Sequence, residues 1–456
     1  MKVINSYPDL APRELGWTST VPASWKVLPC RALVIEQNEK NENSWNQNYL
    51  SLMANIGVIP YEEKGDVGNK KPDDLSKCKV VRKGDLVINS MNYGIGSFGL
   101  SMLDGVCSPV YIVLKPKEDI VHERYALRIF ESKSFQRYAQ SFGAGILDHR
   151  AAIGWDDLKN INVGVPSLEE QAVILQQLDR ETARIDGLVE KKTRFIELLR
   201  EKRQAHITRA VTRGLDPHVK MMDSGVEWLG DVPEHWKVIR LQYVITGIEQ
   251  GWSPECLATP AEVDEWGVVK SGCVNGGLFA PEQNKKLPAN LEPRPEIAIK
   301  SGDILMSRAS GSSDLIGSVG MVGEFSGSLM LSDKIFRINL NGCIIKQFFV
   351  LIMGSRVVRT QIVNAISGAE GLANNLPQAR IKKFWIALPD IEEQAKIVDF
   401  VWKSTARLDA LIEKTERSIE LLKERRSALV TAAVTGQIDL RDMGVAASKI
   451  TVRKTA

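Results

Sequence analysis

Residues 166–216 read PSLEEQAVILQQLDRETARIDGLVEKKTRFIELLREKRQAHITRAVTRGLD, and residues 389–439 read PDIEEQAKIVDFVWKSTARLDALIEKTERSIELLKERRSALVTAAVTGQID. The second stretch begins 223 positions after the first, and 26 of the 51 aligned residues are identical without a gap. Many of the differences keep chemical character, as where Ile185 is matched by Leu408. A long internal repeat predicts a chain built from two copies of one unit.

Both copies have the features of one long helix. A proline precedes each run, at Pro166 and Pro389, paired glutamates occupy the first turn, and basic residues crowd the last turns. This order of charges suits the helix dipole. No Pro or Gly lies within 391–435, and only Gly187 interrupts the first copy. A helix of about 45 residues would be roughly 65–70 Å long.

The apolar residues of both copies recur at near-heptad spacing, which predicts a narrow seam and hence pairing of one helix with the other. The alternative is two unrelated surface helices, each on its own domain. The identity of the two copies extends to solvent-facing residues, which favours pairing. The predicted seam residues are Ile174, Leu178, Ile185, Leu188, Phe195 and Leu199 in the first copy, and Ile397, Val401, Leu408, Leu411, Ile419, Leu422 and Leu429 in the second.

The repeat also covers the globular parts of the chain. Three pairs of segments correspond: 21–27 with 232–238, 83–88 with 301–306, and 108–114 with 332–338. Short β-rich runs and one helical stretch in each part predict mixed α/β domains, so the fold class is α+β. The expected division is 1–165, first domain; 166–214, first long helix; 215–388, second domain; 389–436, second long helix; and 437–456, a polar tail.

Composition limits the classes of function. The 456 residues carry 59 basic and 56 acidic side chains, a net charge of +3, so any nucleic-acid contact must come from local patches. Six scattered cysteines without a CxxC pair fit free thiols in a reducing compartment. Neither a signal peptide nor an apolar run long enough to span a membrane is evident. We therefore expect a cytoplasmic protein.

Motifs that carry catalysis are incomplete in this sequence. The string 94–99 matches GxGxxG, but a turn-like segment follows where a nucleotide site needs a helix. Segment 108–111 lacks the second proline of the (D/N/S)PP(Y/F) motif of amino methyltransferases, and it reads better as the start of a strand. No Walker loop, nuclease carboxylate–lysine set or plausible zinc set is present. The sequence therefore predicts a chain without a catalytic, cofactor or metal site.

Polar and basic residues on Gly-rich or turn-like segments remain as candidate contacts to bases and phosphates. For any one of them, an ordinary polar loop is the competing interpretation. The candidates are Lys70, Lys71, Ser90, Asn92, Tyr93, His149 and Arg150 in the first domain, and Trp252, Ser253, Lys285, Lys286, Ser307, Arg308, Ser310, Asn374, Asn375 and Arg380 in the second.

The combination of motifs resembles the specificity subunit of type I restriction–modification systems. The strings Val165–Gln171 and Leu388–Gln394 are LPxxEEQ-type entries to the long helices, and they occur twice. Segments 223–236, DSGVEWLGDVPEHW, and 84–89, GDLVIN, are also typical of that family. The first domain departs from it, with Glu14-Leu15-Gly16-Trp17 in place of Glu-Trp-Leu-Gly, which leaves the start of that domain less defined.

The resemblance implies two target-recognition domains, each recognising one half of an asymmetric, split double-stranded DNA target. The long helices would pack as an antiparallel coiled coil with pseudo-two-fold symmetry, set the spacing and dock two methyltransferase subunits. A restriction–translocase subunit would join them, and S-adenosylmethionine, ATP and Mg would belong to these partners. Tandem readers of this kind favour half-sites about one helical turn apart.

Other classes of protein remain as alternatives. One is the specificity subunit of a related combined restriction–methylation system. Another is a single-chain nuclease or methyltransferase with a hidden site, which methyl transfer by the isolated chain would reveal. A third is a coiled-coil scaffold without a DNA function, for which selection on random-sequence DNA would enrich no split motif.

Overall fold

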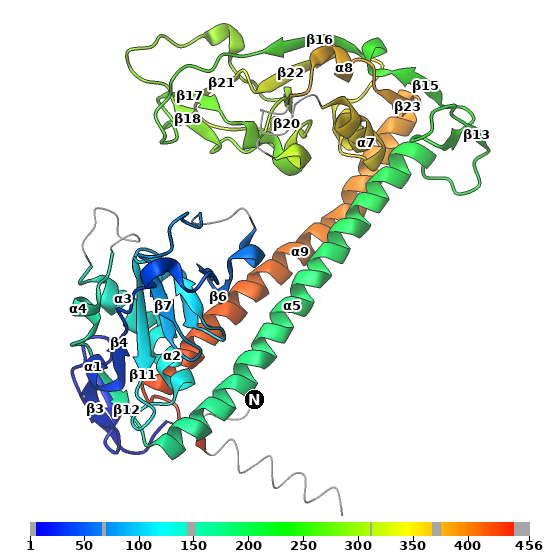
Figure 1. Cartoon of the computed structure of the whole chain (residues 1–456). Helices are drawn as coiled ribbons and strands as arrows, with labels where there is room; N and C mark the ends of the chain where they lie inside the picture. The colour runs from blue at the N-terminus through cyan, green and yellow to red at the C-terminus, as the bar shows by residue number, and fades with distance from the viewer. Residues whose placement is uncertain (1–5, 66–69, 144–151, 311, 367–374, 442–456) are drawn as a thin grey trace, which may run out of the picture. The chain divides into compact units, whose positions relative to one another are not determined.

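The computed structural model divides the chain into two compact units. Unit 1 comprises Met1–Thr193 with Arg417–Ala456, and unit 2 comprises Arg194–Glu416. Two long helices, α5 (Leu168–Arg213) and α9 (Ile391–Val434), each contribute one half to each unit (Figure 1). The structure describes residues 6–65, 70–143, 152–310, 312–366 and 375–441.

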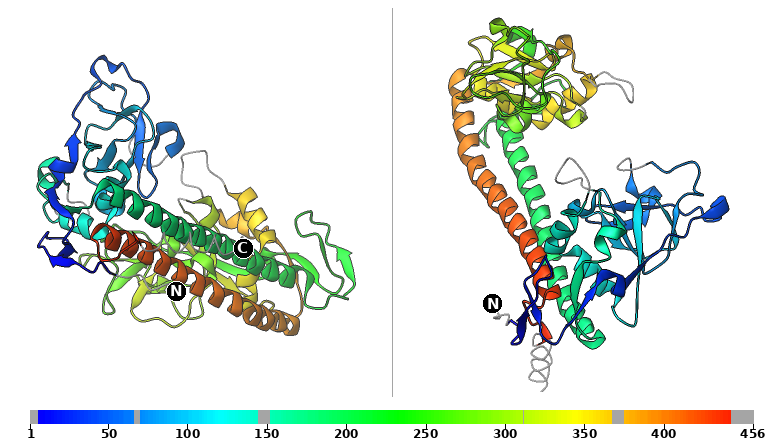
Figure 2. Two further views of the ribbon diagram at one scale, coloured as in Figure 1. Left: turned by 90° about the horizontal axis from the view of Figure 1, so that it is seen from below. Right: turned by 90° about the vertical axis from the view of Figure 1, so that its left-hand side faces the viewer.

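The predicted pair of long helices is confirmed, with 46 residues in α5 and 44 in α9. In unit 1 the start of α5 shares a core with the end of α9, through Ile174, Leu178 and Val430. In unit 2 the end of α5 shares a core with the start of α9, through Ile207 and Ile397. The two helices are therefore antiparallel, and they lie side by side in both views of Figure 2.

Ion pairs between the helices agree with this direction. In unit 1, Arg426 Nε lies 2.9 Å from Asp186 Oδ1. In unit 2, Arg203 Nε lies 2.8 Å from Asp409 Oδ1. These pairs are partly exposed to solvent, so each contributes about 1 kcal/mol or less. Buried apolar residues along the seam supply most of the stabilisation.

The heptad prediction was wrong at three seam positions. Phe195 is 45% exposed, and its neighbour Ile196 is buried instead. Leu188 and Leu411, which are equivalent in the repeat, are also exposed. A straight helix drifts relative to a strict seven-residue repeat, so the contact face passes from one residue to the next along its length.

Each unit is built on the same framework of elements. A four-stranded antiparallel sheet has the order β4-β11-β8-β9 in unit 1 and β16-β22-β19-β20 in unit 2. Three helices accompany it in both. In unit 1 these elements are β4 (Val34–Glu36), β8 (Leu86–Asn89), β9 (Phe98–Leu100), β11 (Tyr111–Pro116), α2 (Glu123–Glu131), α3 (Lys133–Gln140) and α4 (Trp155–Leu158). In unit 2 they are β16 (Ile245–Gln250), β19 (Ile304–Ser307), β20 (Val319–Met321), β22 (Ile335–Leu340), α6 (Lys346–Met353), α7 (Arg356–Ala365) and α8 (Gln378–Ile381).

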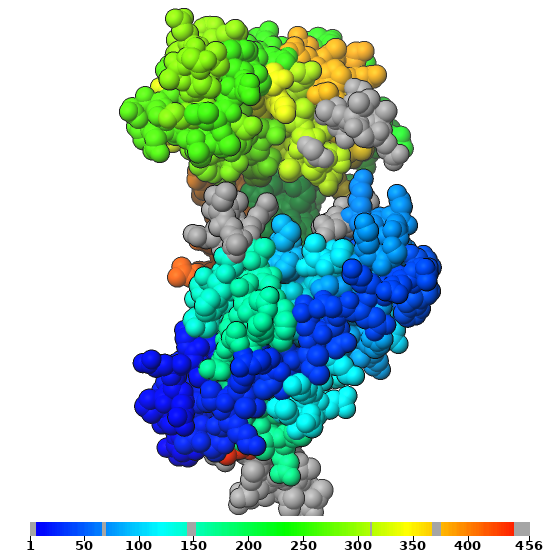
Figure 3. All heavy atoms as spheres, turned by 60° about the vertical axis from the view of Figure 1, so that its left-hand side comes forward, coloured from blue at the N-terminus to red at the C-terminus, as the bar shows by residue number. Residues whose placement is uncertain are grey.

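Two small antiparallel pairs of strands also recur. The strand before each long helix pairs with an early strand of its unit, β12 with β3 and β23 with β15. In the space-filling view of Figure 3, dark blue atoms from the start of the chain lie beside teal atoms of unit 1 that come much later in the sequence. The bounds are β1 (Leu10–Pro12), β2 (Thr20–Pro22), β3 (Lys26–Pro29), α1 (Cys30–Leu33) and β12 (Asn162–Val165), then β13 (Met221–Asp223), β14 (Asp231–Pro233), β15 (Lys237–Arg240) and β23 (Trp385–Leu388).

The remaining strands differ between the units. Unit 1 has two separate antiparallel pairs of strands, β5–β6 and β7–β10, whereas unit 2 has one three-stranded sheet in which β17 and β21 run parallel. The shared framework therefore carries a different accessory sheet in each unit. The bounds are β5 (Leu50–Met53), β6 (Gly57–Pro60), β7 (Lys79–Val81), β10 (Gly105–Cys107), β17 (Trp266–Val269), β18 (Asn284–Lys286) and β21 (Ser328–Met330). Short 3-10 segments occupy 42–44, 61–64, 93–95, 241–243, 271–277, 295–297 and 313–315.

The glutamine of the LPxxEEQ-type string joins each long helix to its domain. Gln394 is fully buried, and its Nε2 donates to the carbonyl oxygens of Cys343 and Pro389, both at 3.0 Å. Its Oε1 accepts from the Ile345 amide at 2.8 Å. Gln171 makes the equivalent three hydrogen bonds in unit 1. The string that suggested the family is thus a structural joint.

The second glutamate of the same string ties the helix to the early strands. Glu170 Oε1 accepts from Trp25 Nε1 at 3.1 Å in unit 1. Glu393 Oε2 accepts from Trp236 Nε1 at 3.0 Å in unit 2. The two tryptophans come from the repeated segments 21–27 and 232–238, so this contact explains why both motifs occur twice.

We expect Gln394→Leu to destabilise unit 2 by about 2–4 kcal/mol. The substitution leaves three backbone groups without their side-chain partner, one buried and two partly buried, and an unsatisfied buried group costs about 1–3 kcal/mol. Urea unfolding followed by circular dichroism measures the change. The matched control is Gln176→Leu on the exposed face of α5, expected to change stability by less than about 0.5 kcal/mol. Equal stability of the two variants would contradict the conclusion that Gln394 joins α9 to its domain.

Candidate DNA-recognition loops

In unit 2, four segments that are distant in sequence meet beyond the end of β19. The Arg308 amide donates to the Lys334 carbonyl at 2.8 Å, and the Leu376 amide donates to the Arg308 carbonyl at 3.0 Å. Ala309 forms a bridge with Asn375. We call residues 250–253, 307–310, 331–334 and 375–376 the second loop cluster. It contains six of the candidates predicted from sequence: Trp252, Ser253, Ser307, Arg308, Ser310 and Asn375.

Asp333 organises this cluster. Its carboxylate accepts a hydrogen bond from the Ser253 hydroxyl. Its carbonyl accepts from Arg308 Nη1 at 3.3 Å and from Gln250 Nε2 at 3.1 Å. One residue therefore fixes the segment after β16, the segment before β22 and the guanidinium that follows β19. No sequence motif marked Asp333, because its partners lie far from it along the chain.

The segment after β16 approaches its neighbour very closely. The amides of Gly251 and Trp252 donate to the carbonyls of Ser332 and Leu331. A side chain at Gly251 would place its Cβ about 2.0 Å from the Leu331 carbonyl oxygen, so only glycine fits. The Trp252 ring in turn lies under the Arg294 guanidinium, 4.1 Å from its centroid. This stacking presents a cation beside an aromatic ring.

Ser307 enters the cluster through its backbone. Its side chain is fully buried, and among the described residues its hydroxyl has no hydrogen-bond partner. The same holds for the buried Ser332 hydroxyl. The Ser307 amide and carbonyl are bonded to Ser318 and Gly317, which hold the strand end in place.

Arg359, on α7, fixes the segment that follows the cluster. Its guanidinium donates to the carbonyls of Ile316 and Ser313 at 2.5 and 2.7 Å. Burial lowers the pKa of this arginine, but an arginine remains charged at neutral pH. It therefore acts as a fixed donor that orients 313–316 from one turn into the helix.

Unit 1 has a smaller equivalent. The Ile153 amide donates to the Ser90 carbonyl at 3.2 Å, and in unit 2 the Leu376 amide donates to the Arg308 carbonyl in the same way. Ile153 and Leu376 are 223 positions apart, which is the spacing of the two long-helix repeats. The Ser90 hydroxyl donates to the Val110 carbonyl at 3.0 Å. We call residues 89–92, 108–110 and 152–153 the first loop cluster; Ser90 and Asn92 belong to it.

Tyr93, which follows directly, lies in the core of unit 1. Its ring is 1% exposed, and its hydroxyl donates to the Phe130 carbonyl at 2.6 Å. Burial raises the pKa of this hydroxyl above its usual value. Tyr93 thus supports the loop from beneath.

The other candidates lie apart from the clusters. Lys71 Nζ donates to the Gln47 carbonyl at 3.4 Å, and Lys70 is exposed beside it. Lys285 is exposed on β18, whereas its neighbour Lys286 forms an ion pair with Glu265. Arg380 is exposed on α8. Three candidates lie outside the described residues: His149, Arg150 and Asn374.

No arrangement for metal binding emerges. Among the described residues, no three His, Cys, Asp or Glu side chains gather closely enough to hold an ion. In the same part of the chain, every helix is too short or too polar to traverse a bilayer.

Comparison with known proteins agrees with this architecture. The sequence model of the type I restriction modification DNA specificity domain matches residues 36–198 and 233–421. The type I restriction enzyme EcoEI specificity subunit of Escherichia coli is 29% identical over 206 residues, which are 45% of this chain and 34% of that subunit. The EcoKI specificity subunit of Escherichia coli K12 is 22% identical over 336 residues, which are 72% of this chain and 68% of that subunit.

A solved structure shows the same fold. It concerns complex assembly and conformational transition of a type I R-M system, and one of its chains superimposes with a TM-score of 0.64 at 15% identity. The superposition covers 92% of this chain and 100% of that chain.

The family model covers more than half of the chain, and it matches once in each unit. The chain therefore belongs to the type I restriction–modification DNA specificity family. Its role is that of a specificity subunit, a non-catalytic component that recognises DNA sequence. Such subunits work with methyltransferase and restriction subunits.

Proposed function

We propose that each unit recognises one half of a split, asymmetric DNA target. The observation that carries this proposal is the equivalent joint between Ser90 and Ile153 and between Arg308 and Leu376. It places a loop cluster at the same point of a shared framework in both units. The accessory sheets and the exposed side chains differ, so the two halves of the target should differ too.

We assign base and phosphate contacts to the cluster members whose side chains are at least partly exposed, and to the isolated basic residues. Arginine, lysine, serine and asparagine on such loops reach base edges and phosphate oxygens. Ser90, Tyr93 and Ser307 are assigned a supporting role, because their side chains are buried. The assigned contacts are Lys70, Lys71 and Asn92 in unit 1, and Trp252, Ser253, Lys285, Lys286, Arg308, Ser310, Asn375 and Arg380 in unit 2; His149, Arg150 and Asn374 stay predictions from sequence.

Mapping of adenine methylation tests this function. The chain is expressed with its methyltransferase subunit in a host that lacks other adenine methylation, and modified positions are read by sequencing. We expect one asymmetric split motif. Methylation without a split motif, or with two identical halves, would overturn the proposal.

We further propose that two methyltransferase subunits dock on the long helices. Three pairs of equivalent apolar residues on α5 and α9 are each between 37% and 57% exposed. Unit 1 and unit 2 carry one member of every pair, as expected if each binds a copy of the same partner. Unit 1 carries Leu168, Leu188 and Leu421, and unit 2 carries Ile391, Leu411 and Leu198.

Single charge substitutions should remove one partner copy at a time. We expect Leu421→Arg to weaken docking at unit 1, and Leu198→Arg to weaken docking at unit 2, because each buries a charge in an apolar contact. Native mass spectrometry of the complex counts the bound methyltransferase subunits, which should fall from two to one. The matched control is Glu424→Arg on α9, an exposed non-apolar position. Two copies bound in every variant would contradict docking at these residues.

A further inference from the structure

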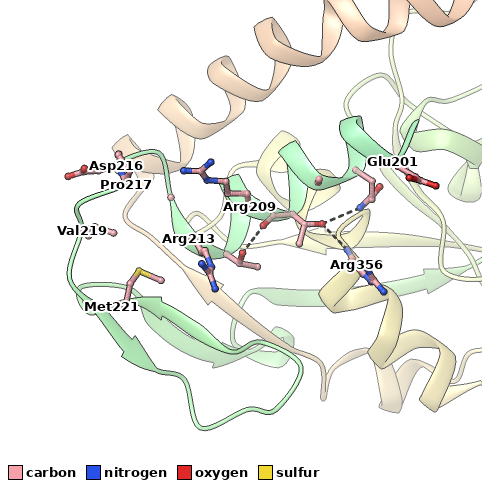
Figure 4. A pocket seen from close by; sticks show the side chains of 13 residues that line it. Glu201, Arg209, Arg213, Asp216, Pro217, Val219, Met221 and Arg356 are labelled. Carbon is pink, nitrogen blue, oxygen red and sulfur yellow. Dashed lines mark hydrogen bonds between the residues drawn. The ribbon is translucent and has the colours of Figure 1, made fainter. Parts of the chain in front are cut away.

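Unit 2 contains a cavity of about 920 Å³ where α5 ends (Figure 4). The last turns of α5, the chain from 214 to 221 and the start of α7 line it. Arg209, Arg213 and Arg356 all contribute to the lining, and all three are exposed. Figure 4 shows them extending from the end of α5 and the first turn of α7.

None of the three guanidiniums is neutralised within the described part of the chain. They make neither a side-chain hydrogen bond nor an ion pair there. Two carboxylates also line the cavity, Glu201 and Asp216, and the Asp216 carboxylate accepts from the His218 amide. The lining therefore carries a net positive charge that no described side chain of the unit neutralises.

The repeat supplies an internal comparison. The positions equivalent to Arg209 and Arg213 in unit 1 are Ala432 and Gly436. The position equivalent to Arg356 is Lys133, whose Nζ donates to Gln136 Oε1 at 3.0 Å. Free arginines at this site thus distinguish unit 2 from unit 1, although both units share the same framework.

Threonines show that the framework itself does not need these arginines. Thr208 accepts from the Arg356 amide at 3.2 Å, and its equivalent Thr431 contacts the Ser132 hydroxyl at 3.1 Å. The end of each long helix is therefore anchored to its neighbouring helix in both units. The arginines are additions to that anchor.

The helix dipoles favour the positions of only two of the three arginines. Arg209 and Arg213 lie near the C-terminus of α5, where the helix dipole favours a cation. Arg356 occupies the first position of α7, where the dipole disfavours a cation and favours an anion. Because Arg356 is also unpaired, a bound anion would relieve this unfavourable placement and use all three guanidiniums.

We propose that this cavity binds a phosphate group of the DNA backbone beside the half-site that unit 2 recognises. This proposal rests on the proposed function. The cavity lies outside the second loop cluster, so it would be an additional contact to DNA. DNA is the favoured source of the phosphate, because α7 links the two regions: Arg356 lines the cavity, and Arg359, one turn further, holds 313–316 beside the second loop cluster. Arginine, threonine and glutamine side chains are common phosphate contacts.

The first test combines three substitutions, Arg209→Ala, Arg213→Ala and Arg356→Ala, in the complex with the methyltransferase subunit. At about 0.15 M salt we expect roughly tenfold weaker binding of the target duplex, and a slope of log K against log salt smaller by about one. The methylated motif should stay the same. The control variant removes three exposed charges from α9: Arg407→Ala, Lys414→Ala and Arg425→Ala.

A scan of neutral methylphosphonates along the duplex locates the phosphate. In the parent complex, one position beside the second half-site should weaken binding by about tenfold. In the triple-alanine variant, the same position should have no effect. A variant with lysine at all three positions should keep most of the salt slope, and thermal unfolding should show that all variants are folded.

Three results would overturn the inference. One is unchanged DNA affinity in the triple-alanine variant. Another is loss of the methyltransferase subunit from the complex with normal DNA affinity of what remains assembled, which would assign the arginines to a protein contact. The third is binding of inorganic phosphate or pyrophosphate, measured without DNA, that depends on the arginines while the methylphosphonate scan finds no sensitive position. In each case the parent complex would still show its split motif, so the proposed function is tested separately.

Discussion

Inserting one heptad into each long helix, after Thr193 in α5 and after Glu416 in α9, should lengthen the gap between the two half-sites by about three base pairs. Seven helical residues add about 10 Å, and B-DNA rises about 3.4 Å per base pair. Methylation mapping should show the same two half-sites, further apart. Modification of the original target should fall by more than about a hundredfold, because a wrong gap leaves one half-site unrecognised.

Both insertions are needed because the helices are antiparallel. They fall at the boundaries between unit 1 and unit 2, so every contact within a unit is kept. An insertion in α5 alone changes the pairing of the helices, and it should instead destabilise the chain. An unchanged gap in the double insertion, or altered half-sites, would contradict the proposal that the helices set the spacing.

Replacing Asp333 with alanine should impair recognition of the second half-site alone. The change removes the carboxylate that accepts from the Ser253 hydroxyl, and so loosens the segment that carries Trp252 and Ser253. The backbone carbonyl that accepts from Arg308 is kept. A well-formed contact to a base contributes about 1–3 kcal/mol of discrimination against the wrong base. We therefore expect discrimination between bases in the second half-site to fall by about 10–100-fold. The first half should keep its sequence.

Two companion variants make this result specific. Asp333→Asn keeps an oxygen that can accept from Ser253, and it should recover much of the discrimination. Asp264→Ala removes an exposed carboxylate elsewhere in unit 2 and should leave the motif unchanged. A uniform loss of affinity with an intact second half would show that Asp333 stabilises the unit without positioning the contacts.

Sequence alone predicted the elements whose signals are local or repeated. The long helices follow from charge order, the lack of Pro and Gly, and periodic apolar residues, which all act over a few turns. Strands β8, β11, β19 and β22 lie within β-rich runs bounded by turn residues. The repeat then predicted that both units share one framework.

Features that depend on distant contacts could not be predicted in this way. Tyr93 and Ser307 belong to polar, loop-like strings, yet tertiary packing buries their side chains. Asp333 acts through residues 25 and 80 positions away. Ile196 is buried at the contact between the helices where Phe195 was predicted, because the helix phase drifts slightly and a strict heptad count ignores that drift.

The division of the long helices between the units also fixes the order in which the protein can fold during synthesis. Unit 2 is one continuous stretch of chain, whereas unit 1 needs residues from 417 onward. Ile174 and Leu178 of unit 1 therefore leave the ribosome well before Val430, their neighbour in the finished core. At about 5–20 residues per second, that apolar surface waits for tens of seconds. Chaperones are therefore most needed while unit 1 is incomplete, because its apolar core residues are then exposed.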